Sequence, residues 1–388
     1  MRSVVLTDSL LEAVQRRLAE DGAEPDGPGL ARAVRSELPG LVSDAEMLRV
    51  IRALQRELVG AGPLAELLAD PATTDVMVNG PGDVRVDRGA GWEPAGIRFA
   101  DEAAVQRLAR RLASAAGRRL DEAQPWVDAR LHDGTRLHAV LAPVAASGTC
   151  LSLRVLRPAR HGMADLAASG TLPGVSDRLV RDILAARLAF LVAGGTGSGK
   201  TTLLAALLGA TDPAERLVVV EDAEELCPPH DHLIRLVARP ANVEGAGAIS
   251  VRDLVRQALR MRPDRLIVGE VRGGEVVDLM AALNTGHDGG AGTVHANTAA
   301  EIPARLEALA AMGGLDRPAL HAQLIGAVQV VLMMRRGQAG RRLAEIAVLE
   351  RGPDGLARLV TAVADGEPVE PGWQSLGRLL SRRAGTRW

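Results

Sequence analysis

A glycine-rich run at residues 194–202 constrains this chain more than any other stretch. It matches the Walker A pattern G-x-x-x-x-G-K-[ST] of phosphate-binding loops. Glycines let successive backbone N–H groups converge on phosphate oxygens, and the N-terminus of the next helix adds a partial positive charge. The lysine reaches the outer phosphates, and the hydroxyl after it binds Mg²⁺. The run therefore predicts a nucleotide site made by Gly194, Gly195, Thr196, Gly197, Ser198, Gly199, Lys200, Thr201 and Thr202.

The sequence on both sides of this loop supports the assignment. Residues 188–193 are apolar and predict a buried strand that ends at the loop, and residues 202–208 predict a leucine-rich helix that begins there. A glycine-rich turn that fitted the pattern by chance would not need these flanks. Lys200 is also the only lysine of the chain, in which Lys and Arg together number 46. Because an arginine fork cannot replace a compact ammonium at a phosphate, we expect this lysine to be functional.

Composition argues against several kinds of protein. The chain has 388 residues, a net charge of -2 and 2% aromatic residues, so neither a basic surface nor stacking side chains indicate stable nucleic-acid binding. Its two cysteines, Cys150 and Cys227, are not spaced as metal ligands, and no zinc site is expected. The first residues lack an apolar signal core, and no run of about 18 apolar residues follows. We therefore expect a cytoplasmic protein that reaches a membrane through partners.

Hydrophobic periodicity divides the chain into five predicted segments. Residues 1–60 predict a helical region, and residues 61–158 predict an α+β domain with one amphipathic helix. Residues 159–174 are predicted to be a linker. Short apolar strands alternate with helices over 175–350, which predicts a doubly wound, largely parallel sheet. Residues 351–388 are predicted to be a C-terminal tail, with one strand-like run before an end interrupted by glycine and proline.

An acidic cluster follows one of the predicted strands. Residues 217–221 are apolar up to Glu221, and Asp222 and Glu225 come next. Ligands of a doubly wound sheet bind at the carboxyl ends of its strands, so these carboxylates are expected beside the phosphate loop, where they can orient water or hold Mg²⁺ through water. The alternative is an acidic helix start, which the helix dipole favours. The position at a strand end favours the functional interpretation.

Glu270 ends an apolar strand of the Walker B type. This glutamate comes about 70 residues after the phosphate loop, and it can polarise the attacking water or bind Mg²⁺ through water. Gly269 stands where the common pattern has aspartate, so the strand alone is an incomplete match. Together with the phosphate loop, it predicts a hydrolytic site.

Two histidines, His287 and His295, lie in a glycine-rich segment further along the chain. An imidazole near the γ-phosphate could sense hydrolysis through its protonation. Taken alone, each histidine is more often a hydrogen-bonded structural residue, and no third ligand is spaced for a metal. His295 ends a predicted strand, so the topology places it at the same edge as the phosphate loop, the acidic cluster and Glu270.

The order of these motifs resembles that of the ATPases of type II secretion, type IV pili and type IV secretion. After the phosphate loop come Glu-Asp-x-x-Glu, Arg-Pro-Asp-Arg-x-Ile-Val-Gly-Glu-Val-Arg-Gly-Gly-Glu, Thr-Gly-His-Asp-Gly and Thr-Val-His-Ala-Asn. The chain looks most similar to the branch of tight-adherence (Tad) pili and conjugal transfer, including the stretches 62–81 and 127–136. The resemblance implies a RecA-like P-loop NTPase domain after a smaller α+β, PAS-like domain.

The resemblance also implies roles for individual residues. Lys200 and Thr201 would hold the phosphates and Mg²⁺, with Asp222 and Glu270 as further Mg²⁺ ligands, directly or through water. The family's remaining motifs would be an Asp box of Glu221, Asp222 and Glu225, a Walker B glutamate, Glu270, and a His box of His287 and His295.

Four arginines are implied as well, and two features depart from the family pattern. Arg136 and Arg154 of the α+β domain would reach the γ-phosphate, and Arg235 and Arg239 would lie near a subunit boundary. In a chain so rich in arginine, each one could equally be a solvated surface charge. The tetracysteine zinc module of many relatives is missing, and Gly290 stands where the family often has serine, which leaves the geometry of the His-box loop open.

We therefore expect a homo-hexameric ATPase, with ATP and Mg²⁺ as cofactors, that drives pilus assembly or secretion through an inner-membrane platform protein. Either Glu270 or an Asp-box glutamate would orient the attacking water, and the sequence does not decide between them. One alternative is a conjugation motor or nucleic-acid translocase, which the near-neutral charge and scarce aromatic residues disfavour. The other is a nucleotide switch without hydrolysis, which the intact motifs disfavour.

Overall fold

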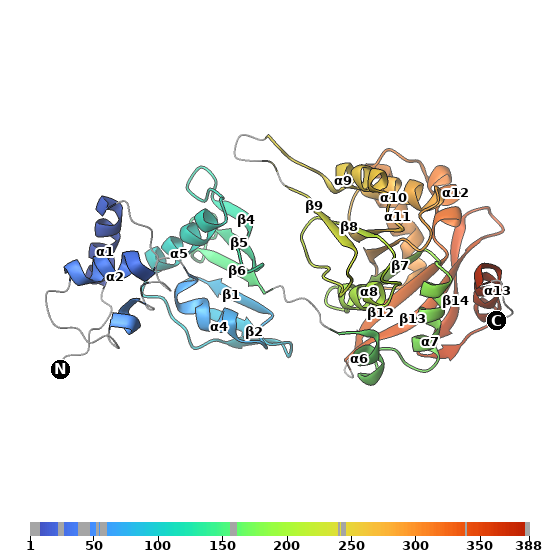
Figure 1. Cartoon of the computed structure of the whole chain (residues 1–388), viewed down its shortest axis with the longest axis horizontal. Coiled ribbons are helices and arrows are strands. Elements are labelled where there is room, and N and C mark those ends of the chain that lie inside the picture. Colours follow the sequence, from blue (N-terminus) through green and yellow to red (C-terminus); the bar gives the residue numbers. More distant parts are fainter. Residues whose placement is uncertain are drawn as a thin grey trace. The chain divides into compact units, whose positions relative to one another are not determined.

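The chain forms two compact units, residues 1–157 and residues 158–388 (Figure 1). Each unit has its own hydrophobic core. The structure is a computed structural model, and it describes residues 8–21, 27–37, 47–51, 54, 60–155, 161–239, 241, 246–337 and 340–384. Among these residues, no helix is both long and apolar enough to cross a membrane.

The first unit begins with the predicted helical region. Helices α1 (Asp8–Asp21) and α2 (Gly27–Glu37) pack together, and residues 47–51 and 54 are also helical. Their shared apolar side chains form a small separate core. Buried members of this core include Leu10, Val14, Leu30, Val34 and Leu54.

A six-stranded antiparallel sheet forms the rest of the first unit, in the order β3-β2-β1-β6-β5-β4. Helix α5 (Glu102–Ala115), capped by the Asp101 side chain, buries its apolar stripe in the same core as alternate strand residues. The other strand residues are largely exposed, so one face of the sheet is polar. The elements are η1 (Gly62–Leu64), α4 (Ala65–Ala69), β1 (Asp75–Asn79), β2 (Val84–Asp87), β3 (Trp92–Pro94), β4 (Trp126–Arg130), β5 (Arg136–Val140) and β6 (Cys150–Arg154).

A nine-stranded sheet organises the second unit, in the order β15-β14-β13-β12-β7-β11-β10-β8-β9. The six strands from β12 to β9 are parallel, as the alternation of strands and helices predicts, whereas β13, β14 and β15 add an antiparallel extension. The strands are β7 (Phe190–Gly194), β8 (Leu217–Glu221), β9 (Leu233–Val237), β10 (Arg265–Val271), β11 (Ala291–His295), β12 (Val330–Gly337), β13 (Gly340–Arg351), β14 (Ala357–Ala364) and β15 (Glu367–Pro368).

Helices cover both faces of this sheet (Figure 1). Along β7, Phe190 and Val192 enter one core, and Leu191 and Ala193 enter the other, because successive side chains of a strand point to opposite faces. The first core takes α6 (Met163–Ala168), α7 (Ser176–Ala185), α8 (Lys200–Gly209) and α13 (Gly372–Ala384). The second takes α9 (Val251–Ala258) with η2 (Leu259–Met261), α10 (Glu275–Asn284), and α11 (Ile302–Met312) with η3 (Ala299–Glu301) and α12 (Arg317–Ala327).

Two predicted segments differ from the structure. Within the predicted linker at 159–174, residues 163–168 form α6, and Met163 and Leu166 are buried in the first core of the second unit. Within the predicted tail, the expected strand-like run is present as β14, which extends the sheet, whereas the end that was expected to be interrupted forms α13 and buries Leu376 and Leu380. Helices α6 and α13 both carry apolar side chains at helical spacing. Burying these side chains stabilises the fold more than leaving them exposed in a linker or a tail would. The other predicted boundaries stay predictions.

Candidate nucleotide-binding site

The glycine-rich run forms a loop between β7 and α8. Strand β7 ends at Gly194, and α8 begins at Lys200. A Cβ atom on Gly194 would lie 2.5 Å from both the Met334 carbonyl oxygen and Ser198 Oγ, so only glycine fits there. Gly199 caps α8 with a φ of 96°, in the left-handed region that glycine adopts without strain. The loop therefore has the tight, backbone-lined form that a phosphate cradle requires.

Lys200 lies inside this loop. Its Nζ donates hydrogen bonds to the carbonyl oxygens of Gly194 and Gly195, each at 3.0 Å. Burial lowers the pKa of the Lys200 ammonium, and the nearby Glu270 carboxylate opposes that shift. Ser198 Oγ is buried without a hydrogen-bond partner among the described residues. A half-buried cation and an unsatisfied buried hydroxyl within one glycine loop fit a bound phosphate.

The strand register brings the predicted motifs to one edge of the sheet. Gly194 pairs with His295 of β11, and β8 ends at Glu221. Strand β10 pairs with β8 up to Val268, so Glu270 follows at the same edge. His295 is half-buried there. This is the common edge that the topology of a doubly wound sheet predicts.

An arginine bridges two of the predicted acidic ligands. Arg272 donates from Nη2 to Glu270 Oε2 at 2.5 Å and from Nη1 to Asp222 Oδ2 at 3.0 Å. The hydrogen bond to Glu270 raises the pKa of Arg272 and is the largest influence on it. The two carboxylates are thus gathered around one cation at the strand ends.

These residues fit Mg²⁺ better than they fit a protein-enclosed metal. No group of three or more His, Cys, Asp or Glu side chains among the described residues could hold a metal ion. Mg²⁺ keeps several waters and binds through one or two carboxylates plus substrate phosphates. Asp222, Glu270 and the Thr201 hydroxyl in the first turn of α8 are a donor set of that kind.

Glu221 is buried beneath the acidic cluster. Its side chain is 3% exposed, and Oε1 accepts hydrogen bonds from the backbone N–H groups of Glu225 and Leu226, at 3.1 and 2.9 Å. Burial raises the pKa of Glu221 to about 7. A Cβ atom on Gly269 would lie 2.6 Å from Glu221 Cγ. The neighbouring strand therefore explains why this Walker B strand has glycine where aspartate is common.

The two histidines of the predicted His box lie at opposite ends of β11. His295 ends the strand, whereas His287 precedes it and contacts the Ala282 carbonyl oxygen through Nδ1 at 3.1 Å. The strand spans roughly 13 Å between its first and last Cα atoms. Within this unit His287 is thus remote from the phosphate loop, and its catalytic role stays a prediction.

Gly290 in the same segment is required by packing. A Cβ atom there would lie 2.4 Å from Leu283 Cδ2 and 2.8 Å from the Leu266 carbonyl oxygen. The serine that is frequent at this place in the family would not fit the present loop. Glycine at position 290 is therefore explained by the close packing of this loop.

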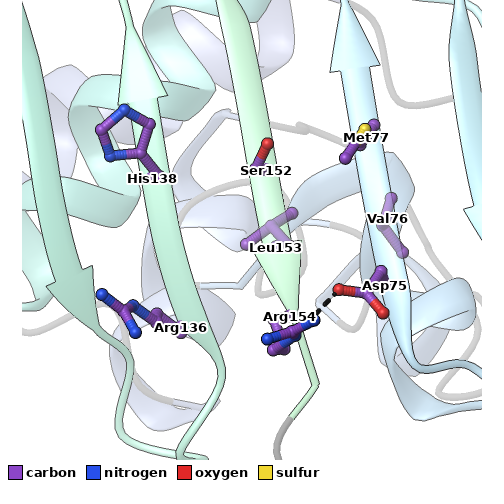
Figure 2. A pocket seen from close by; sticks show the side chains of 8 residues that line it. All are labelled: Asp75, Val76, Met77, Arg136, His138, Ser152, Leu153 and Arg154. Atoms are coloured by element: carbon purple, nitrogen blue, oxygen red, sulfur yellow. Dashed lines mark hydrogen bonds and ion pairs between the residues drawn. The ribbon is translucent and has the colours of Figure 1, made fainter. Parts of the chain in front are cut away.

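The first unit brings Arg136 and Arg154 together on the polar face of its sheet. They pair across β5 and β6 in register, and both line a hollow of about 220 Å³ (Figure 2). Arg154 Nε lies 3.1 Å from Asp75 Oδ1, and Arg136 Nη2 lies 2.9 Å from Asp128 Oδ2. Each guanidinium is thus held by a carboxylate, and a contact with phosphate stays a prediction.

Arg235 and Arg239 lie at the end of the sheet where β9 is the last strand. Arg235 on β9 donates to Cys227 Sγ at 3.0 Å and pairs with Glu224. Arg239 donates to the Gly247 carbonyl oxygen at 3.0 Å. These contacts explain the local loop structure, and a role at a subunit boundary stays a prediction.

Sequence reasoning missed three residues beside the site. Arg272 follows the Walker B glutamate by two positions, so its place in the motif could have marked it. Arg341 donates to the Gly197 carbonyl oxygen from 144 residues away, and no pattern singles it out among so many arginines. Asn297 Oδ1 lies 3.8 Å from where a Cβ atom on Gly195 would stand, and it ends the quoted Thr-Val-His-Ala-Asn run.

Most of the chain is similar to known proteins. Residues 57–341 match the family described as "Type II/IV secretion system protein". A Mycobacterium tuberculosis protein named "Putative conjugal transfer protein" is 61% identical over 351 residues, which cover 89% of this chain and 99% of the relative. The type IV secretion system protein PtlH of Bordetella pertussis is 33% identical over 300 residues, covering 69% and 87%. The conjugal transfer protein TrbB of Rhizobium radiobacter is 31% identical over 309 residues, covering 78% and 91%.

Solved structures share the fold. The pilus retraction motor PilT with bound ADP matches with a TM-score of 0.52 at 20% identity, over 83% of this chain and 88% of that one. The ATPase DotB of Yersinia pseudotuberculosis matches with a TM-score of 0.52 at 16% identity, over 88% and 85%. The expected α/β architecture, with an N-terminal domain before an ATPase-type domain, is confirmed.

Proposed function

This chain belongs to the type II/IV secretion system protein family, and we propose that it is an ATP-hydrolysing motor of a secretion, pilus or conjugal-transfer machine. The observation that supports this most is the single sheet edge that carries the phosphate loop, Glu270 and His295. Such an edge combines phosphate binding with a carboxylate that can act on water, which a nucleotide-binding scaffold alone would not need.

The loop and Lys200 would bind the phosphates. On binding, the Lys200 ammonium exchanges its two carbonyl contacts for phosphate oxygens, and the loop N–H groups supply the remaining donors. Mg²⁺, when bound with the nucleotide, neutralises phosphate charge and orients the leaving group. Asp222 and Glu270 must release Arg272 for this, because its guanidinium now bridges them.

Of the acidic residues, Glu270 is the one we propose to orient the attacking water. Glu221 is 3% exposed, its Oε1 accepts two backbone N–H groups, and its Oε2 is buried as well, so a water could reach this carboxylate only if the Asp-box turn opened. Glu270 is half-buried at the edge, and the hydrogen bond that its carboxylate accepts comes from the Arg272 side chain, which can move. Glu221 would then shape the Asp-box turn rather than act on water.

The remaining parts of the proposal come from the family. Arg136 and Arg154 would stabilise the charge that develops on the γ-phosphate, as arginine fingers do. A homo-hexamer on the cytoplasmic side of the inner membrane would act on a platform protein there. Names of relatives favour one further candidate, a motor for DNA transfer, because both the Mycobacterium tuberculosis and the Rhizobium radiobacter proteins are named for conjugal transfer.

The proposal is tested by removing Lys200. We expect Lys200→Ala to abolish measurable ATP hydrolysis by the full chain while its thermal melting without nucleotide stays unchanged. Phosphate release is the measurement, with and without single-stranded DNA. Turnover of Lys200→Ala at the wild-type rate would overturn the ATPase assignment. Wild-type turnover that rises with DNA would favour the DNA-transfer motor, and turnover indifferent to DNA would favour the pilus or protein-secretion motor.

A further inference from the structure

The hairpin of β12 and β13 lies against the phosphate loop. Met334 of β12 pairs in register with Gly194, so the residues after Met334 continue alongside the loop. Further along the hairpin, Arg336 pairs with Arg341. Arg341 Nε donates a hydrogen bond to the carbonyl oxygen of Gly197 at 3.0 Å. The loop therefore has an anchor outside its own strand and helix.

This anchor acts on one particular peptide group. The carbonyl of Gly197 and the N–H of Ser198 belong to the same planar trans peptide, so they point in opposite directions. The carbonyl is held by Arg341 on one side, and the Ser198 N–H donates to the Gly195 carbonyl oxygen at 3.3 Å on the other. Arg341 thus fixes the direction of a loop N–H that it does not touch.

The peptide needs such an anchor because of its glycine. Gly197 has a φ of 69° and no side chain, so rotation of the adjoining peptide meets little steric resistance. A rotated peptide would turn its carbonyl oxygen toward the loop interior, where it would repel a phosphate oxygen. With the carbonyl held by Arg341, the Ser198 N–H keeps pointing the other way, where a phosphate oxygen could replace the Gly195 carbonyl oxygen as its acceptor.

We propose that Arg341 is a positioning residue of the nucleotide site, which holds the Gly197–Ser198 peptide so that its N–H faces the phosphates of a nucleoside di- or triphosphate. The inference rests on the proposed function, because it assumes that the loop binds such phosphates. Arg341 is an exposed residue of the β12–β13 hairpin, and it lies outside the family motifs quoted from the sequence.

Arg342 offers a matched control on the same hairpin. It has the same side chain and is also exposed, but its guanidinium pairs with Asp365 at 3.1 Å. The Arg342→Ala substitution therefore removes one positive charge, as Arg341→Ala does, and breaks one exposed ion pair. Any effect of Arg341→Ala that Arg342→Ala does not share must come from the contact with the loop.

The experiment measures ADP binding to the full chain by calorimetry, together with KM and kcat for ATP. We expect Arg341→Ala to weaken ADP binding and raise KM by about tenfold, the scale of one hydrogen bond, with melting without nucleotide unchanged. Arg341→Lys should recover part of the affinity, since an ammonium can donate to the same carbonyl. Arg342→Ala should bind ADP like the wild type.

Two outcomes would overturn the inference. One is equal ADP affinity for Arg341→Ala and Arg342→Ala. The other is an Arg341→Lys variant as weak as Arg341→Ala, which would mean that the guanidinium acts in some other way than through the Gly197 carbonyl. Failure of the proposed function looks different, because then the wild-type chain itself would not bind ADP.

Discussion

At the scale of single residues, the site separates carboxylates that the sequence presents as equivalent. Glu221 and Glu270 both end strands at the same edge. Burial and two backbone hydrogen bonds fix Glu221 in place, whereas Glu270 is half-buried and is hydrogen-bonded by the Arg272 guanidinium. A sequence cannot show this difference, because it depends on which side chain the neighbouring strand covers.

Glu270→Gln is expected to lower kcat for ATP hydrolysis by about 10² to 10⁴, the usual contribution of a general base. The amide keeps the size of the side chain and can still accept from Arg272, so the affinity for ADP measured without Mg²⁺ should stay near that of the wild type. Steady-state phosphate release and ADP calorimetry are the measurements, with Glu221→Gln as the paired variant. A Glu221→Gln enzyme that loses kcat while Glu270→Gln retains it would reverse the assignment.

At the scale of elements, the ends of β8 and β10 are fitted to each other. The Glu221 side chain occupies the space that a side chain at Gly269 would need. Burial of this carboxyl group favours its neutral form, which raises its pKa from its ordinary value of 4.5 to about 7. The stability of this contact between the two strands should therefore depend on pH.

The free energy of unfolding should show that dependence. Because the folded pKa of Glu221 is raised, its neutral form stabilises the fold fully below pH 4.5, and this contribution is lost as pH rises through about 7. Relative to Glu221→Gln, the wild type should lose roughly 3 kcal/mol between pH 4.5 and pH 8. Urea unfolding of both proteins across this range is the measurement. Parallel pH profiles for the two proteins would contradict the prediction.

Element identities were largely predictable, and tertiary contacts were not. Predicted strands at 217–221 and 291–295 match β8 and β11, because apolar runs of that length bounded by polar residues have few alternatives. The helix α6 was missed, because six residues carry too little periodicity to separate a short helix from a linker. The opposite placement of His287 and His295 followed only from the strand that separates them.

At the scale of the whole molecule, two units with separate cores carry different parts of the predicted chemistry. The second unit holds the phosphate loop and the acidic edge, and the first holds Arg136 and Arg154. The sequence motifs predicted the phosphate loop and the acidic edge directly. The two arginines were predicted only through the resemblance, because neither composition nor spacing separates them from the other basic residues.

A double variant, Arg136→Ala with Arg154→Ala, should therefore separate turnover from binding. We expect kcat to fall by at least about 10³, the scale of an arginine finger, while ADP affinity changes less than twofold because the loop is intact. Arg85→Ala with Arg130→Ala is the matched control, since both residues are exposed on strands of the same sheet. Equal turnover of the two double variants would remove the arginines from the mechanism.

The place of Lys200 has a consequence for how the protein responds to chemical reagents. It is the only lysine, and its Nζ is engaged by two loop carbonyls. Through side chains, an amine-directed crosslinker could join two copies only from Lys200 of one to Lys200 of the other, so such a crosslink would report that two of these loops lie within its reach. Carboxyl- or cysteine-directed reagents have more positions to use in mapping an assembly of this chain. Any reagent that acylates a lysine side chain likewise reports on the glycine-rich loop alone.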